Sequence, residues 1–382
     1  MNKKVALLTY HAAYNFGSML QAFATQTAIN SLGYDCKIIN YRLKSQKDIY
    51  ATLHWDKVKN PVEYKREIDN LGVLYDYKVK RAKRFESFMK RYMNLTKEIN
   101  EYKPALEEIN KYRVAISGSD QILNMNTGEI SRMTFDYMRP YLLDVDMVKK
   151  VSYASSFANT KEEQLDILGP YFNKFSSFSV REKSWQEKVQ KYCMCNVEHV
   201  ADPTFLLTRK DWIRLLNIRK RKPKKKYILF YTLYSYEHTK PKLEILLKTI
   251  KYIDIDIHII APFCEKSVAD ISPKIIEKLD CGPREFLDEL LNAEFVIPES
   301  FHGLTLSIIF NKRFACPSGK TGPELRKIEV LEATGLSDRW RPNFWEIKLP
   351  DIFEDFDYTE TNKKIEEFRA KSFKYLANSL SE

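Results

Sequence analysis

Short, continuous apolar segments alternate with longer helical stretches along the 382-residue chain, and this alternation restricts its fold more than any other feature. Two series of these segments are predicted as strands: 5–9, 37–41, 112–117, 150–155 and 176–180, then 227–231, 256–261, 295–298 and 313–315. Apolar strands separated by helices are typical of parallel sheets that helices cover on both faces. The sequence therefore predicts an α/β protein with two doubly wound, Rossmann-like lobes.

The predicted domain boundaries follow from where the two strand series stop and start. Residues 1–207 form the first lobe and residues 208–350 the second. A basic helical stretch at about 60–94 interrupts the first series and is predicted to pack on the first lobe. A helical segment, 351–382, is predicted to pack back on the lobes. Residues 219–226 carry seven basic residues around Pro223; a solvated linker is the preferred interpretation, and contact with anionic membrane lipid is the alternative.

The formal net charge of +11 favours acidic partners. No nucleic-acid motif accompanies this charge, so a phosphorylated substrate, near an anionic membrane, is the preferred partner. No segment approaches the ~20 apolar residues of a membrane helix, which predicts a soluble, cytoplasmic and at most membrane-peripheral protein. The spacing of Cys193 and Cys195 is a poor zinc pattern. We therefore expect reduced thiols, no metal and no cofactor.

Polar residues follow the predicted strands at the points where doubly wound sheets bind ligands. The first such junction contains Asn15, Gly17 and Gln21, and it opens a helix whose amino end suits an anion. An ordinary helix start is the equally weighted alternative. The second junction contains Ser119 and Asp120, of which Asp120 can orient a hydroxyl or simply cap a helix.

A third junction follows the segment 295–298. It places Glu299 and Ser300 before His302 and Gly303, at the start of an apolar helix. The positive end of a helix disfavours a charged imidazole, and a nearby carboxylate opposes that effect. The pair Glu299 and His302 could thus hold the imidazole ready for proton transfer.

Arg181 stands just beyond the strand 176–180 and could bind a carboxylate or phosphate in a planar fork. A surface ion pair with Glu182 is the alternative. The segment around Asp202 and Pro203 is interpreted as a rigid turn at the crossover between lobes.

In this order, the segments resemble the polysaccharide pyruvyl transferase family. The resemblance runs through Asn15-Phe16-Gly17-Ser18, Gly118-Ser119-Asp120-Gln121, Ser152-Tyr153-Ala154-Ser155, Ser179-Val180-Arg181-Glu182, Asp202-Pro203-Thr204 and Ser300-Phe301-His302-Gly303, with a late match at Gly335-Leu336-Ser337-Asp338-Arg339. It implies a GT-B-like fold with the active site in the cleft between the lobes. It also implies phosphoenolpyruvate as donor and a pyruvate ketal on a sugar as product.

The family has an essential His at the third junction and an Arg that binds the donor, which correspond to His302 and Arg181 in this sequence. Some members carry an Arg two residues before the His, where this chain has Ser300. Another cationic residue must then bind the donor, and the candidates are Arg284 and Arg313.

The resulting hypothesis is a bacterial enzyme of capsule or exopolysaccharide synthesis. His302 and Glu299 are assigned to catalysis, and Arg181, Ser300, Gly303, Arg284 and Arg313 to the donor. The acceptor, a lipid-linked or nucleotide-linked sugar, is assigned to Asn15, Gly17, Gln21, Ser119 and Asp120. Two alternatives stay open: a sugar-nucleotide-dependent glycosyltransferase of the same fold, and a non-catalytic binding protein of polysaccharide assembly.

Overall fold

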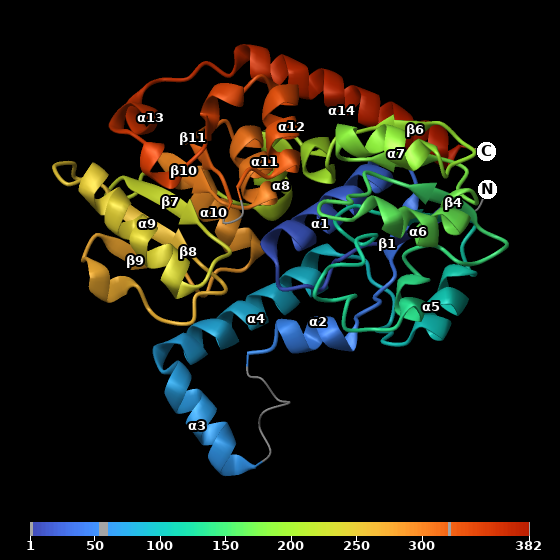
Figure 1. Ribbon diagram of the computed structural model, residues 1–382, viewed down its shortest axis with the longest axis horizontal. Helices are drawn as coiled ribbons and strands as arrows, with labels where there is room; N and C mark the ends of the chain where they lie inside the picture. Colours follow the sequence, from blue (N-terminus) through green and yellow to red (C-terminus); the bar gives the residue numbers. More distant parts are fainter. Residues whose placement is uncertain (1–2, 53–59, 320–321, 382) are drawn as a thin grey trace. The chain divides into compact units, whose positions relative to one another are not determined.

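The computed structural model describes residues 3–52, 60–319 and 322–381, and the chain divides into two compact units. Unit 1 comprises Met1–Ala51, Met89–Leu207 and Ile365–Glu382. Unit 2 comprises Thr52–Phe88 and Thr208–Lys364. Each unit has its own parallel sheet, coloured blue to green in unit 1 and yellow to orange in unit 2 (Figure 1).

Unit 1 is built on a four-stranded parallel sheet in the order β2-β1-β3-β4. Its strands are β1 (Lys4–Leu8), β2 (Asp35–Ile38), β3 (Val114–Ser117) and β4 (Lys149–Ser152). The parallel pair β5 (Phe178–Val180) and β6 (Val197–His199) continues beside β4 through a bridge between Val151 and Ser177. All four residues of β3 are buried, as expected for a strand covered on both faces.

Helices of unit 1 connect these strands. They are α1 (Phe16–Ser31), α2 (Lys44–Ile49), α5 (Tyr102–Ile109), α6 (Leu165–Phe172) and α7 (Gln186–Gln190). The first of them, α1, begins at Phe16, where the Asn15 side chain caps it by accepting hydrogen bonds from the Gly17 and Ser18 amides.

Unit 2 contains a five-stranded parallel sheet in the order β11-β10-β7-β8-β9. Its strands are β7 (Tyr227–Tyr231), β8 (Asp256–Ile260), β9 (Ile275–Glu277), β10 (Phe295–Pro298) and β11 (Arg313–Phe314). Its helices include α8 (Arg209–Leu216), α9 (Tyr236–Thr249), α10 (Pro283–Asn292), α11 (Phe301–Ile309), α12 (Leu325–Thr334) and α13 (Leu349–Phe353). A small parallel pair joins β12 (Cys316–Pro317) to β13 (Trp340–Arg341).

The predicted α/β class with parallel sheets is confirmed, and β7 and β10 have the predicted bounds. The strands β6 and β9, of three residues each, are not among the predicted strands. The segment 37–41 begins its strand two residues earlier, at Asp35, in register with Lys4 of β1.

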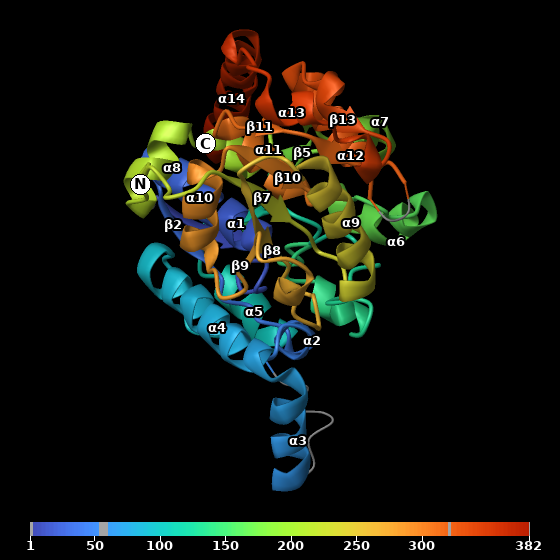
Figure 2. The same cartoon turned by 90° about the vertical axis from the view of Figure 1, so that its left-hand side faces the viewer.

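The helical stretch 60–94 differs from its prediction in two respects. It forms two helices, α3 (Pro61–Leu71) and α4 (Val73–Tyr92), which Figure 2 shows at an angle to each other. Gly72 separates them with φ of 50°, a conformation that ends a helix. Up to Phe88 this stretch belongs to unit 2 rather than to the first lobe, because Leu74 packs in the core of unit 2.

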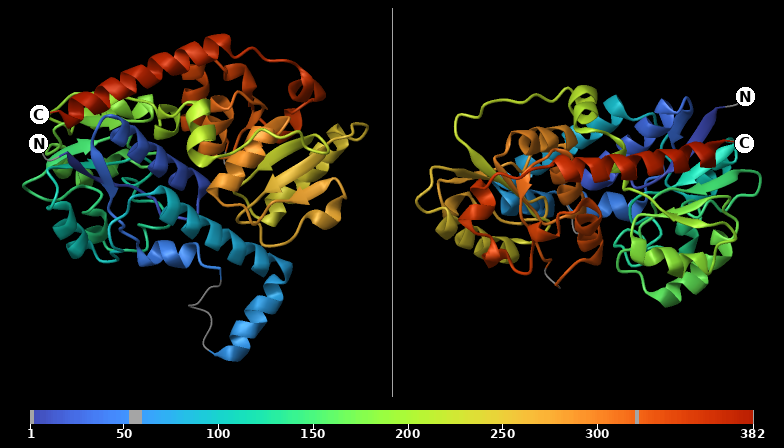
Figure 3. Two further views of the ribbon diagram at one scale, coloured as in Figure 1. Left: turned by 180° about the vertical axis from the view of Figure 1, so that it is seen from behind. Right: turned by 90° about the horizontal axis from the view of Figure 1, so that it is seen from above.

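The last helix, α14 (Thr359–Leu380), is a single long helix in Figure 3. From Ile365 onward it belongs to unit 1. There the Tyr375 hydroxyl donates to the Ser152 carbonyl at 2.7 Å, and the Ser372 hydroxyl accepts from the Ala201 amide at 2.9 Å. These bonds attach the end of the chain to the strand ends of the first sheet.

Candidate functional site

Each sheet reverses its strand order at one point. In unit 1 the reversal lies between β1 and β3, and in unit 2 between β7 and β10. Doubly wound sheets bind ligands outside the carboxyl ends of the strands at such a point. The three junctions singled out in the sequence follow β1, β3 and β10, so each of them lies at a reversal point.

In unit 1, a short hydrogen bond joins the first turn of α1 to the turn that follows β3. The Ser18 hydroxyl donates to Asp120 Oδ2 at 2.6 Å, and Asn15 caps the same helix turn. Gln21 donates from Nε2 to Thr9 Oγ1 at 2.6 Å. Its buried Oε1 has no hydrogen-bond partner among the described residues. The first two predicted junctions are thereby brought together in one unit.

The end of β3 has an unusual backbone. Gly118 has φ of 123° and Asp120 φ of 68°, both in the region that side chains rarely adopt. A Cβ added to Gly118 would lie 2.1 Å from the Tyr153 carbonyl oxygen. The Ser119 hydroxyl donates to the Ala154 carbonyl at 2.6 Å and is buried. The turn therefore depends on glycine to bring the Asp120 carboxylate to the edge of the sheet.

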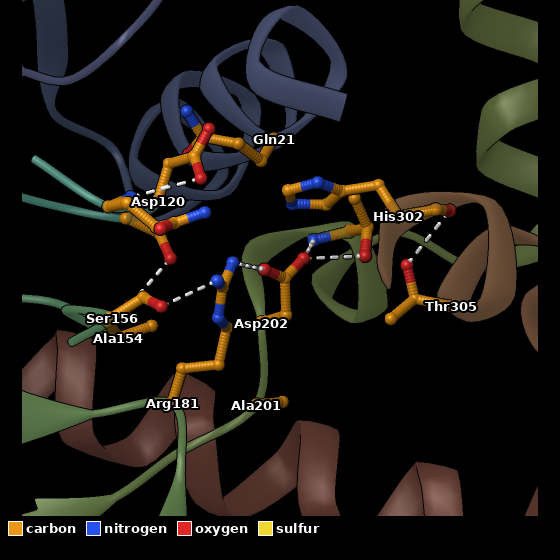
Figure 4. A network of polar contacts seen from close by, with 12 residues as sticks. Gln21, Asp120, Ala154, Ser156, Arg181, Ala201, Asp202, His302 and Thr305 are labelled. Carbon is orange, nitrogen blue, oxygen red and sulfur yellow. Dashed lines mark hydrogen bonds and ion pairs between the residues drawn. The ribbon is translucent and has the colours of Figure 1, made fainter. Parts of the chain in front are cut away.

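Arg181 lies at the centre of a buried ionic network in unit 1 (Figure 4). It donates from Nε to Glu182 Oε1 at 3.1 Å, from Nη1 to Asp202 Oδ2 at 2.9 Å and from Nη2 to Ser156 Oγ at 2.7 Å. The three ionic side chains are 1 %, 3 % and 0 % exposed. Burial opposes the charge, but the surrounding carboxylates raise the pKa of Arg181 above its ordinary value.

The sequence left open a surface ion pair between Arg181 and Glu182. The structure contains this ion pair, but both side chains are buried. The Arg181 guanidinium fixes the end of β5 against the turn at Asp202, whose Oδ1 also accepts from the Thr204 amide and hydroxyl. Two carboxylates bond to the one guanidinium, and the charge of Asp120 also acts on it. The assignment of Arg181 to donor binding stays a prediction.

In unit 2, His302 lies in the first turn of α11, directly beyond β10. Ser300 caps this helix by accepting a hydrogen bond from the Gly303 amide at 2.9 Å. A Cβ on Gly303 would approach Tyr231 Cδ1 to 2.8 Å, so glycine permits the close packing of α11 on β7. The Thr305 hydroxyl donates to the His302 carbonyl, as Figure 4 shows. The imidazole is thus held at the positive end of a helix.

Glu299 forms an ion pair with Lys242. Its carboxylate is fully buried, and Oε1 accepts a short hydrogen bond from the Lys242 ammonium on α9. Its Oε2 has no hydrogen-bond partner in the described part of the chain. Sequence reasoning expected Glu299 to tune His302, three residues later, and the structure pairs the Glu299 carboxylate with Lys242. The catalytic assignment of both residues stays a prediction.

The two candidate replacement cations have other hydrogen-bond partners in unit 2. Arg313 pairs with Glu294, and it lies in register with Phe295 at the amino end of β10, whereas His302 follows the carboxyl end. Arg284 donates to the Leu216 and Asn217 carbonyls at the end of α8, at 3.0 and 2.7 Å. Their assignment to donor binding has no support in these contacts.

Sequence reasoning missed two lysines near the third junction. Lys242 pairs with Glu299, and the buried Lys327 donates to the Glu299 carbonyl and to Glu324, each at 2.9 Å. In the sequence both resemble ordinary helix-surface lysines. Only the packing of α9 and α12 against the end of β10 distinguishes them.

The described residues contain no group of three or more His, Cys, Asp or Glu side chains that could hold a metal ion. None of the helices in the described part of the chain has both the length and the apolar character needed to cross a bilayer.

The fold and the two reversal points define an α/β protein of two Rossmann-like lobes, with polar residues gathered beyond the strand ends. Residues 15–316 match the model of the polysaccharide pyruvyl transferase family. The chain belongs to this family, which identifies it as a transferase of polysaccharide biosynthesis. No curated protein sequence matches the chain.

Among solved structures, a putative UDP-N-acetylglucosamine 2-epimerase from Listeria monocytogenes is 9 % identical, with a TM-score of 0.51 over 99 % of this chain and 91 % of that one. The MnaA–UDP structure from S. aureus is 11 % identical, with a TM-score of 0.48 over 91 % and 87 %. The glycosyltransferase SnogD from Streptomyces nogalater is 10 % identical, with a TM-score of 0.43 over 100 % and 98 %. The first likeness shows the fold alone and confirms the predicted GT-B-like class. An active site between the lobes stays a prediction.

Proposed function

We propose that the protein transfers the pyruvyl group of phosphoenolpyruvate onto a sugar of a cell-surface polysaccharide precursor and forms a pyruvate ketal. The observation that carries the proposal is the position of His302, in the first turn of α11 at the strand reversal of unit 2. In a chain of this family, that position combines a proton-transfer group with a helix end that favours oxyanions.

Ketal formation from phosphoenolpyruvate has definite chemical requirements. The methylene carbon must gain a proton, and a sugar hydroxyl must attack the adjacent carbon. Phosphate then leaves, and a second hydroxyl of the same sugar closes the ring. We assign the proton transfers to His302 and the neutralisation of the donor oxyanions to the amino end of α11. No oxidant, metal or cofactor enters this balance.

The acceptor is assigned to unit 1. Asp120 lies there beyond the end of β3, where its Oδ2 accepts a hydrogen bond from the Ser18 hydroxyl. A carboxylate can accept hydrogen bonds from sugar hydroxyls. The unfilled acceptor on Gln21 has the same preference. Asn15, Gly17 and Ser119 would shape the turn that presents these groups.

The acceptor class is a lipid-linked or nucleotide-linked sugar, and the reaction is assigned to the cytoplasm. Peripheral contact with an anionic membrane through residues 219–226 is a weaker part of the proposal. Three of the seven basic residues in this segment already pair with acidic ones: Arg221 with Asp288, Lys225 with Asp256, and Lys226 with Glu294.

The main alternatives are a sugar-nucleotide-dependent glycosyltransferase and a non-catalytic binding protein. The products separate all three hypotheses. A pyruvyl transferase releases inorganic phosphate, and its product gains the mass of pyruvate less one water. A glycosyltransferase releases a nucleoside diphosphate, and a binding protein releases neither.

The test is to incubate the protein with phosphoenolpyruvate and a panel of lipid-linked and nucleotide-linked sugars, following phosphate release and product mass together. His302→Gln should abolish both signals. His258→Gln should retain them, because His258 lies on β8 and pairs with Glu289 at 2.7 Å. Ketal formation by His302→Gln at the wild-type rate would refute the assignment of His302.

A further inference from the structure

Lys242 is a cation held at the strand reversal of unit 2 by a single acidic partner. It lies in the second turn of α9, the helix that follows β7, and its ammonium bonds to Glu299 Oε1. The ammonium also lies 4.4 Å from the centre of the Tyr234 ring. Its side chain is 19 % exposed, whereas that of Glu299 is 0 % exposed. Lys242 is therefore the solvent-facing member of the pair.

This ion pair is only half satisfied. Glu299 Oε2 is buried and has no hydrogen-bond partner among the described residues. A buried acceptor without a partner is unfavourable, and a pair that served stability alone would be expected to fill both oxygens. The Lys242 ammonium has three hydrogen-bond donors, and the contact with Glu299 uses one of them. The ammonium also faces the Tyr234 and Phe344 rings, at 4.4 and 5.9 Å from their centres, and rings are weak acceptors, so it can still donate to a ligand that approaches from the exposed side.

Lys327 does not have this capacity. It is 2 % exposed, and it donates to both the Glu299 carbonyl and the Glu324 carboxylate. Its role is to fix the backbone before α11. Lys242 is thus the lysine at this junction that is both charged and accessible.

We infer that Lys242 is an oxyanion-binding residue of the unit 2 site and that Glu299 is the counter-ion that holds it in position. The inference rests on the proposed function, in which an oxyanion of phosphoenolpyruvate binds at the amino end of α11. Glu299 directly precedes Ser300, the residue that caps this helix. Lys242 therefore supplies a positive charge that Ser300 cannot.

The pair makes two predictions of opposite sign. Lys242→Met removes the cation and should weaken binding of the donor. Glu299→Gln removes the charge that competes with the donor for Lys242, and it should strengthen binding. A pair with a purely structural role would lower thermal stability in both variants and leave the affinity of the folded protein unchanged in both.

The experiment is calorimetric titration of the full-length protein with phosphoenolpyruvate, inorganic phosphate and pyruvate in separate arms. Loss of a charge-assisted hydrogen bond should weaken binding by about ten- to a hundredfold in Lys242→Met. The matched control is Lys240→Met, an exposed position on the same helix, which should bind as the wild type does. Lys242→Arg should retain most of the affinity because it keeps the charge.

The arms of the experiment identify which oxyanion is recognised. A loss with phosphate assigns Lys242 to the phosphoryl group, and a loss with pyruvate assigns it to the carboxylate. Unchanged affinity for all three probes in Lys242→Met would overturn the inference. If Lys242→Met does not fold, the affinity of Glu299→Gln for the donor provides the test. Unchanged or weaker binding in Glu299→Gln would also overturn the inference.

The outcome separates this inference from the proposed function. Binding of phosphate that depends on Lys242, in a protein that never consumes phosphoenolpyruvate, would refute the pyruvyl transfer and support the subsite. Normal ketal formation and donor affinity in Lys242→Met would support the transfer and refute the subsite.

Discussion

Substituting methionine for Arg181 would remove the guanidinium that pairs with two buried carboxylates. Glu182 and Asp202 are almost completely buried, and each bonds directly to the guanidinium. Breaking a buried ion pair by removing one partner costs about 3–5 kcal/mol. For a unit of this size, each kcal/mol lowers the melting temperature by about 2–4 °C, so the unit 1 transition should fall by about 6–20 °C.

Scanning calorimetry measures this shift, and hydrogen exchange in β5 locates it in unit 1. Adding Asp202→Asn to Arg181→Met should restore part of the stability, because one uncompensated charge disappears. The control is Arg214→Met, since the Arg214 side chain is 71 % exposed and its pair with Asp211 contributes little. If Arg181→Met lowered the free energy of unfolding by less than about 1 kcal/mol, the reasoning would be refuted, because removing one partner of a buried ion pair costs more than that.

Three further predictions concern unit 1. Gly118→Ala should destabilise the unit severely, as measured by urea unfolding, because the new Cβ would clash with the Tyr153 carbonyl oxygen at a positive φ; a wild-type midpoint would contradict the geometry. A hydrogen bond from Cys193 lowers the pKa of the Cys195 thiol to about 7. The rate of Cys195 alkylation should therefore increase as the pH passes through 7. In Cys193→Ala this increase should occur at higher pH. Burial lowers the pKa of His199 to about 4, so the unfolded chain binds the proton first and stability should fall as pH decreases from about 6.5 to 4. In His199→Gln this pH-dependent loss should be smaller, and an identical denaturation profile would contradict it.

The central strands of the fold could be predicted from the sequence because each is marked by a local run of apolar residues. The strands β7 and β10 are continuous apolar segments bounded by polar residues, and their limits were predicted correctly. The predicted junctions at Asp120 and His302 followed from the same rule, since parallel strands place what comes after them at one edge of the sheet.

Features that depend on contacts distant in sequence were not readable. The pairing of Lys242 with Glu299 spans 57 residues and is set by how α9 packs on the sheet. Leu74 joins the core of unit 2 although it lies within the first strand series, and its helical pattern alone does not specify which core it enters. The break at Gly72 was a local signal that the prediction of one long helix overlooked.

The fate of carbon 2 of phosphoenolpyruvate tests the central claim most directly. Donor labelled with ¹³C at that carbon is incubated with the protein and an acceptor sugar, and the product is followed by NMR. The account predicts that the label becomes a ketal carbon bonded to two sugar oxygens, together with release of one phosphate. A label that stays in unreacted donor across the acceptor panel, while the protein releases a nucleoside diphosphate from a sugar nucleotide, would contradict it.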